Sequence, residues 1–166
     1  MTPFHTLSAA GFAATAITFG PARMGFGLFL PEFREAFGLG SGAAGMISGA
    51  GFTGFLLGLV AAYALTARRG PRLPVVLGLA AAAVGSALVA LAPGVATLTA
   101  GTALAMSSAG FAWSPYNNAV HREVADGQRP RALSAVSTGT ALGVAAAGAV
   151  ALALAFGALP WRAGWA

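Results

Sequence analysis

Long apolar runs separated by short polar stretches form the main pattern of this chain. Each run approaches or exceeds about 20 residues, the length that an α-helix needs to cross a hydrocarbon layer about 30 Å thick. Polar and apolar positions do not alternate within the runs, so the pattern favours helices over the strands of a membrane barrel. Five transmembrane helices are predicted, over residues 7–30, 43–66, 73–92, 95–118 and 132–157.

Composition supports an all-α, polytopic transmembrane helix bundle, formed as a single transmembrane domain over residues 1–166. Of the 166 residues, 57% are hydrophobic and only 8% are charged, and the mean hydropathy is +0.78. These values exclude an ordinary soluble domain. The chain has no cysteine, which excludes a disulfide framework and a thiolate metal site.

Arginines between the predicted helices indicate how the chain is oriented. The first and third connections hold only Arg34, whereas the second and fourth are rich in arginine. The positive-inside rule therefore predicts a cytoplasmic N-terminus, and abundant Ala, Gly and Arg without Lys suggest a bacterial cytoplasmic (inner) membrane. Because the arginines form short clusters, we expect a lipid bilayer as partner and no nucleic acid. The clustered arginines are Arg68, Arg69, Arg72, Arg122, Arg129 and Arg131.

Small residues recur at every fourth position in the second and fifth predicted helices. Helix association inside a bilayer depends on close backbone contact at such residues. We interpret both stripes as packing faces and not as evidence for a particular function. They consist of Ala50, Gly54 and Gly58 in one helix and of Gly139, Gly143 and Ala147 in the other.

The basic connection YALTARRGPRLPVVLG resembles the signature loop of the major facilitator superfamily. In that loop a glycine, an aspartate followed by a basic residue, and a second glycine precede further basic residues. Arg68, Gly70 and Arg72 occupy the matching positions, whereas Tyr63 and Ala67 replace the first glycine and the aspartate. The family's aspartate helps to latch its two halves together, so the resemblance implies a weaker latch in this chain.

Two further stretches resemble the same superfamily. QRPRALSAVSTGTALG is similar to its basic loop and the start of its fifth helix, with Arg129, Arg131 and Gly139 at matching positions. RMGFGLFLPEFREAFGL is similar to the first helix and outer loop of YbfB/YjiJ-like transporters. The chain departs from the pattern at Thr102, where the fourth helix often has an arginine, and at Val144, where antiporters have a proline.

The resemblance covers the chain as the first five helices of a twelve-helix protein. It implies a partial N-terminal domain without its sixth helix and C-terminal half, and Trp161 and Trp165 are interpreted as interfacial anchors leading into that sixth helix. The implied function is secondary active transport of a small organic solute by alternating access around a central site. The implied partners are a small-molecule substrate and the missing half, and no cofactor is expected.

Arg23 is a permanent charge inside the first predicted helix. On insertion scales a mid-helix arginine costs about 2.5 to 3.5 kcal/mol, which cancels most of what the helix's Leu, Ile and Phe residues contribute at about 0.3 to 0.6 kcal/mol each. The helical neighbours Gly20 and Gly27 are small enough to leave a cavity beside it. The alternative is that Arg23 extends toward the outer surface, because it lies near the helix end.

No carboxylate falls within a predicted helix, since Glu32 and Glu35 lie in the predicted outer connection and Glu123 and Asp126 in an inner one. A partner for Arg23 must therefore come from elsewhere. We hypothesise that it is the anionic group of the solute or a residue of the missing half.

The end of the fourth helix, FAWSPYNNAVH, gathers aromatic and amide side chains around a proline. Trp113, Tyr116 and Asn117 are predicted to line the substrate path, and an ordinary interfacial belt is the alternative. Beyond them, Glu123, Asp126 and the arginines of both inner connections, Arg129 and Arg131 among them, are predicted to form a cytoplasmic charge network that opens and closes with transport. The alternative for these charges is that they set topology alone.

Two other classes of function are alternatives to transport. An enzyme needs convergent acid, base, nucleophile or metal ligands, and with two histidines far apart and no acid in the helices we expect neither catalysis nor a metal site. The other class is a small polytopic membrane scaffold, or a half-transporter that acts as an oligomer.

Overall fold

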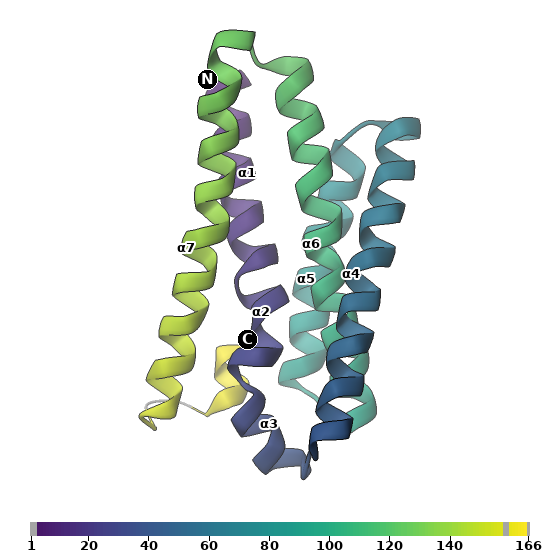
Figure 1. Cartoon of the computed structure of the whole chain (residues 1–166), viewed down its shortest axis with the longest axis vertical. Coiled ribbons are helices and arrows are strands. Elements are labelled where there is room, and N and C mark those ends of the chain that lie inside the picture. Colours follow the sequence, from purple (N-terminus) through teal and green to yellow (C-terminus); the bar gives the residue numbers. More distant parts are fainter. Residues whose placement is uncertain (1–2, 158–159, 166) are drawn as a thin grey trace.

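The computed structural model describes residues 3–157 and 160–165. These residues form helices without any strand, so the predicted all-α fold is confirmed (Figure 1). The α-helices are α1 (Pro3–Phe19), α2 (Pro21–Leu28), α3 (Leu30–Phe37), α4 (Ser41–Arg69), α5 (Arg72–Ala90), α6 (Val95–Glu123) and α7 (Arg129–Ala155), and the short 3₁₀ helices are η1 (Asp126–Gln128) and η2 (Trp161–Gly164).

The long helices run side by side along the long axis of the molecule (Figure 1). α6 packs against both α4 and α5, α7 packs against α1, and α1 also contacts α6. One end of the bundle holds the start of α1 and the arginine-rich α4–α5 and α6–α7 connections, and we call it the basic end. The opposite end holds α3, the α5–α6 connection and η2, and we call it the aromatic end.

Four helices in the described residues are long and apolar enough to cross a membrane. They are α4, α5, α6 and the continuous segment Asp126–Ala155. α1 has only 17 residues, which falls short of the length of about 20 residues that a spanning helix needs. The polypeptide that precedes α4 therefore crosses the bundle as a series of shorter helices.

The continuous helix predicted over residues 7–30 is wrong, because the chain breaks at Gly20 and again at Phe29. Pro21 and Pro31 follow these breaks and occupy the first turns of α2 and α3. Proline has no N–H group to donate and disfavours helical geometry in the preceding residue, which explains both positions. The predicted outer connection is also wrong, since most of it is helix α3, which ends at Gly38 with a φ of 62°.

The glycine stripes serve as packing faces, as predicted. A Cβ atom at Gly54 or Gly58 would overlap backbone atoms of α6, and a Cβ atom at Gly139 or Gly143 would overlap backbone atoms of α1. The hydroxyl group of Thr15 on α1 also donates to the carbonyl oxygen of Val136 on α7 at 2.7 Å. Close backbone contact plus an interhelical hydrogen bond therefore joins α1 to α7.

An aromatic cluster closes the aromatic end and replaces the interfacial anchors predicted at Trp161 and Trp165. The Trp165 ring is 6% exposed and its centroid lies 5.8 Å from that of Phe29. The Trp161 ring meets Phe33 edge-on at 5.1 Å, and Phe33 is completely buried. α2 and α3 turn a phenylalanine-rich face toward η2, so Trp165 is buried in the bundle while Trp161 is partly buried against the same cluster.

Candidate functional site

Arg23 lies in the first turn of α2, directly after the break at Gly20. Its guanidinium carbon stands 4.7 Å from the centroid of the Phe55 ring and 5.3 Å from that of Phe19. Both distances lie within the range of a cation–π interaction. Phe55 is the midpoint of the 29-residue helix α4, 14 positions away from either terminal residue, Ser41 or Arg69. The charge is therefore held about 20 Å from both ends of that helix, at 1.5 Å per residue.

The polar contacts of Arg23 are incomplete. Its Nε atom is buried and has no hydrogen-bond partner among the described residues. None of the four acidic residues lines the hollow around it. The ring faces of Phe19 and Phe55 supply part of the missing stabilisation, but they accept no hydrogen bond in the plane of the guanidinium group.

The guanidinium group opens onto a cavity of about 500 Å³ between α1, α2, α4, α6 and α7. The apolar wall includes Leu59 and Ala109, and the Trp113 ring meets Phe19 at a centroid distance of 5.7 Å. Two hydroxyl groups complete the lining, from Ser137 and Thr140. The Oγ1 atom of Thr140 is buried and has no hydrogen-bond partner in the part of the chain that the structure describes.

A smaller hollow of about 150 Å³ lies on the other side of Arg23, between α2, α4 and α6. Gly27 lines it, together with Phe52 and Met106. The Arg23 side chain is thus part of the wall of both hollows.

The structure brings together only some of the predicted path residues. Arg23 and Trp113 share the larger cavity, and Gly27 lines the smaller hollow. Gly20 lines neither, because it packs against the backbone of Gly143.

Tyr116, also predicted to line the path, lines a separate cavity at the basic end. Asn117 lines none of these three cavities. Trp113 and Tyr116 line different cavities although they are only three positions apart on α6, and the fully buried Pro115 lies between them in the sequence.

Sequence reasoning missed Phe55, Ser137 and Thr140. Ser137 and Thr140 are hydroxyl residues in an otherwise apolar run, at a helical spacing of three, which places them on the same side of α7. That spacing is a usable signal. Phe55 carried no comparable signal, since it is one of several large apolar residues on α4.

One ion pair of the predicted charge network is formed among the described residues. Arg129 pairs with Asp126, at 2.6 Å between Nη1 and Oδ1, and its Nε atom donates to the carbonyl oxygen of Val124. Neither Glu123 nor Arg131 takes part in an ion pair among the described residues. The short helix η1 places Asp126 just before the first turn of α7, where Arg129 lies, and a network that includes Glu123 and Arg131 stays a prediction.

The loop residues Arg68, Gly70 and Arg72 form the turn between α4 and α5. Gly70 has a φ of 77° and its N–H group donates to the carbonyl oxygen of Thr66, which ends α4. This conformation is easy for glycine and strained for other residues. Arg68 and Arg72 are exposed on either side of the turn.

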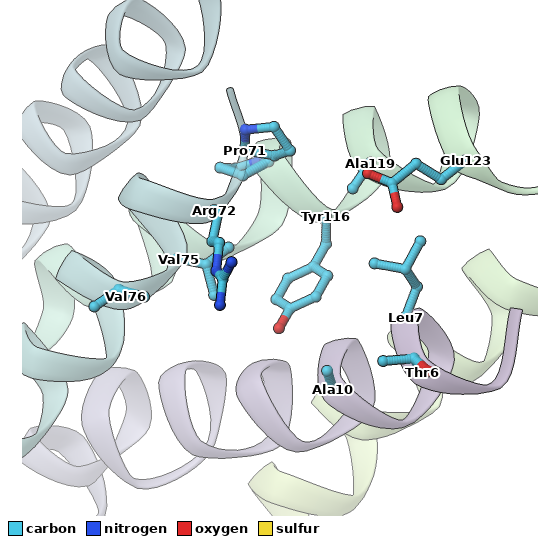
Figure 2. A pocket seen from close by; sticks show the side chains of 11 residues that line it. Thr6, Leu7, Ala10, Pro71, Arg72, Val75, Val76, Tyr116, Ala119 and Glu123 are labelled. Atoms are coloured by element: carbon cyan, nitrogen blue, oxygen red, sulfur yellow. The ribbon is translucent and has the colours of Figure 1, made fainter. Parts of the chain in front are cut away.

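A second large cavity, of about 580 Å³, lies at the basic end between α1, α5 and α6 (Figure 2). The Tyr116 side chain points into it, with the Arg72 guanidinium group beside the ring and Leu7 and Ala10 of α1 opposite. Glu123 lies at its rim. Most of the wall is apolar, as in the cavity at Arg23, but this cavity has an acidic residue, Glu123, as well as an arginine in its lining.

Apolar helices of spanning length surround a mid-depth cavity that contains one guanidinium group and two hydroxyl groups. This arrangement defines a polytopic membrane protein with a cavity large enough for a small solute. Among the described residues no cluster of three or more His, Cys, Asp or Glu side chains offers a metal site. The chain belongs to the Major Facilitator Superfamily, whose sequence model matches residues 9–166. It is therefore a multi-pass membrane protein of a transporter family. No curated protein matches the chain, so the YbfB/YjiJ-like resemblance stays a prediction.

Proposed function

We propose that this chain forms one side of the central site of a secondary transporter that moves a small anionic organic solute by alternating access. The observation that carries the proposal is Arg23, a guanidinium group at the depth of the α4 midpoint whose buried Nε atom has no hydrogen-bond partner in the described chain. A charge in such a place is costly unless it faces a partner or a water-filled cavity. An anionic solute that enters the cavity supplies that partner.

The cavity wall suits an amphipathic anion. A carboxylate at Arg23 accepts two parallel hydrogen bonds from the guanidinium fork, which is the strongest arrangement that these groups form. Ser137 and Thr140 add hydroxyl donors, and Phe19, Leu59 and Trp113 offer an apolar surface to the body of the solute. Weak solvation inside a bilayer strengthens the attraction between the two charges relative to water.

Alternating access requires a second helical half that closes the other side of the site. The Trp113 side chain is 37% exposed although it lines the cavity, which supports an open face toward such a half. We further propose that the basic end faces the cytoplasm of a bacterium, because its connections carry most of the arginines.

Binding of an anion is tested with the chain reconstituted in lipid nanodiscs. Trp113 serves as the reporter in a background with Trp161→Phe and Trp165→Phe, benzoate is the probe, and benzamide is its neutral control. We expect benzoate to quench Trp113 fluorescence, benzamide to bind at least ten-fold more weakly, and Arg23→Gln to remove the difference. Arg131→Gln, which removes the same charge from the basic end, is the matched control. Equal binding of both probes contradicts an anion site.

Transport is tested separately, by uptake into sealed proteoliposomes. We expect no uptake of radiolabelled benzoate by the 166-residue chain alone, because one wall of the site cannot alternate between two sides. Uptake by the chain alone, together with dimers in cross-linking, would favour the oligomeric half-transporter instead.

A further inference from the structure

We propose that the solute of the Arg23 cavity is a monoanion with a neutral hydrogen-bonding group at its far end, such as an aromatic hydroxy acid, and that Ser137 recognises this group. The inference rests on the proposed anion site, and it adds the class of substrate and the residue that selects it. It follows from the order of the guanidinium group and the two hydroxyl groups along the cavity of about 500 Å³.

Contacts between α1 and α7 fix the levels of these groups along the bundle. The two helices run in the same direction, since both begin at the basic end (Figure 1). A Cβ atom at Gly20, which lies between α1 and α2, would overlap backbone atoms of Gly143 on α7. Gly20 and Gly143 therefore lie at the same level.

Arg23 and the hydroxyl residues lie on opposite sides of that level. Arg23 follows Gly20 by three positions, toward the aromatic end. Thr140 and Ser137 precede Gly143 by three and six positions, toward the basic end. At 1.5 Å per residue, the backbone of Arg23 lies about 9 Å from that of Thr140 and about 14 Å from that of Ser137 along the bundle axis.

The Arg23 side chain covers part of this length. Its guanidinium carbon lies 5.3 Å from the ring centroid of Phe19, a residue one helical turn closer to the basic end. Thr140 thus carries the nearer hydroxyl group, and Ser137, one turn further along α7, carries the more distant one. We therefore assign the carboxylate of the solute to Arg23, with Thr140 beside it, and a second polar group of the solute to Ser137.

The apolar part of the wall suits an aromatic ring. Trp113 and Phe19 meet edge-on with their ring centroids 5.7 Å apart, and Leu59 and Ala109 line the same cavity. Aromatic rings pack favourably against one another in offset or edge-on arrangements. A ring that carries its second group opposite the carboxylate directs that group away from Arg23.

The second group of the solute has to be neutral and polar. Among the described residues that line this cavity, Arg23 is the only charged one, so a second charge would lose hydration without gaining a counter-charge on this wall. The Ser137 hydroxyl group can donate and accept a hydrogen bond. It has no hydrogen-bond partner among the described residues, whereas the hydroxyl group of the adjacent Thr138 donates to the carbonyl oxygen of Ser134. A site built to bond a substrate hydroxyl group discriminates against an analogue that lacks it.

The test is equilibrium dialysis of radiolabelled benzoate against the 166-residue chain in lipid nanodiscs, with empty nanodiscs as the correction for partition into lipid. The competitors are 4-hydroxybenzoate and 4-methylbenzoate, which have the same charge and nearly the same size. We expect 4-hydroxybenzoate to displace benzoate at a concentration at least five-fold lower. Ser137→Ala should reduce this difference to less than two-fold and leave the affinity for benzoate itself within two-fold of the parent. Ser134→Ala is the matched control, because it is the same substitution one turn earlier on α7, outside the cavity lining, and it should keep the difference.

The position of the hydroxyl group on the ring gives a second arm. In 2-hydroxybenzoate the hydroxyl group lies against its own carboxylate, so this compound should gain less than two-fold over 2-methylbenzoate. An equal gain at both ring positions would place the second group near Arg23 and overturn the assignment to Ser137.

Failure of this inference and failure of the anion site give different results. Equal displacement by 4-hydroxybenzoate and 4-methylbenzoate, or a difference that persists in Ser137→Ala, would overturn the inference, while benzoate binding that depends on Arg23 would still support the anion site. Absence of benzoate binding, or binding that Arg23→Gln leaves unchanged, would contradict the proposed function and this inference with it.

Discussion

Arg23 and Arg162 occupy opposite kinds of environment, although both lie against aromatic rings. The guanidinium carbon of Arg162 stands 4.3 Å from the centroid of the Trp161 ring, and its two Nη atoms donate to the carbonyl oxygens of Ala90 and Ala92 at 2.6 and 3.0 Å. Arg23 has two rings but its buried Nε atom has no acceptor among the described residues.

The difference separates a structural arginine from a candidate binding residue. The carbonyl groups at the end of α5 have no partners within the helix, so a cation that caps them is stabilising. Arg162 does this and thereby fastens η2 to the end of α5. Arg23 stabilises no helix end; its side chain lines a cavity, and its buried Nε atom has no acceptor among the described residues. In a membrane bundle, a hydrogen-bond donor without an acceptor is therefore a better indication of a binding site than the charge itself.

Arg162→Met should give the largest change in stability. It removes two hydrogen bonds from a charged donor, each worth about 1.5 to 3 kcal/mol, so we expect the free energy of unfolding to fall by about 3 kcal/mol. Equilibrium unfolding in mixed micelles with increasing SDS measures this change. The matched control is Arg34→Met, because Arg34 is exposed and makes one long contact, at 3.4 Å, with Ser41. If both variants lose the same stability, Arg162 is not a structural cap.

Arg23→Met should have the opposite sign in the same assay. Removing a charge from mid-membrane recovers about 2.5 to 3.5 kcal/mol on insertion scales, while the cation–π contacts that are lost are worth up to about 2 kcal/mol. We therefore expect the variant to be more stable than the parent by about 1 kcal/mol. If Arg23→Met lowers the free energy of unfolding as much as Arg162→Met does, Arg23 stabilises the fold, and the proposed difference between the two arginines is wrong.

The contrast between these arginines also shows what the sequence can and cannot predict. Arg23 could be singled out from sequence because a charge within a long apolar run is expensive wherever it points. The role of Arg162 could not be predicted, because its partners Ala90 and Ala92 are about 70 residues away and contribute only backbone atoms. Every residue has a backbone carbonyl group, so contacts of this kind cannot be predicted from residue type.

The sequence predicts where the long helices lie, but it does not predict that the first one is broken into shorter helices. Apolar length alone predicted spanning helices where α4, α5, α6 and α7 now lie, although those helices extend beyond several predicted bounds. The breaks around α2 depended on Pro21 and Pro31, which are visible in the sequence but which a membrane helix can also absorb as kinks. Within the predicted charge network, the pair of Arg129 with Asp126 depends on η1, which places Asp126 beside the start of α7.

Phe55→Leu tests whether the rings offset the missing acceptor of Arg23. The substitution keeps an apolar side chain and removes one of two cation–π contacts, so we expect the free energy of unfolding to fall by about 1 kcal/mol. In the Arg23→Met background the same substitution should cost clearly less, which a double-mutant cycle measures. Identical costs in both backgrounds would show that Phe55 contributes packing only.

Thr140→Val should have the smallest effect on stability and is the sharpest test of the cavity. Valine has nearly the same shape, and Thr140 Oγ1 is buried without a partner in the described chain. Removing an unsatisfied buried hydroxyl group is nearly neutral or stabilising, so the free energy of unfolding should rise by less than about 1 kcal/mol. If the hydroxyl group binds the anion, benzoate affinity should nevertheless fall about three-fold, which is close to the lower end of the net free energy of one hydrogen bond.

Thr138→Val is the matched control, because Thr138 is exposed on α7 and its hydroxyl group already donates to the carbonyl oxygen of Ser134. Stability and affinity that both stay unchanged in Thr140→Val would show that the Thr140 hydroxyl group takes no part in binding, and would leave Arg23 and Ser137 as the polar groups of the site.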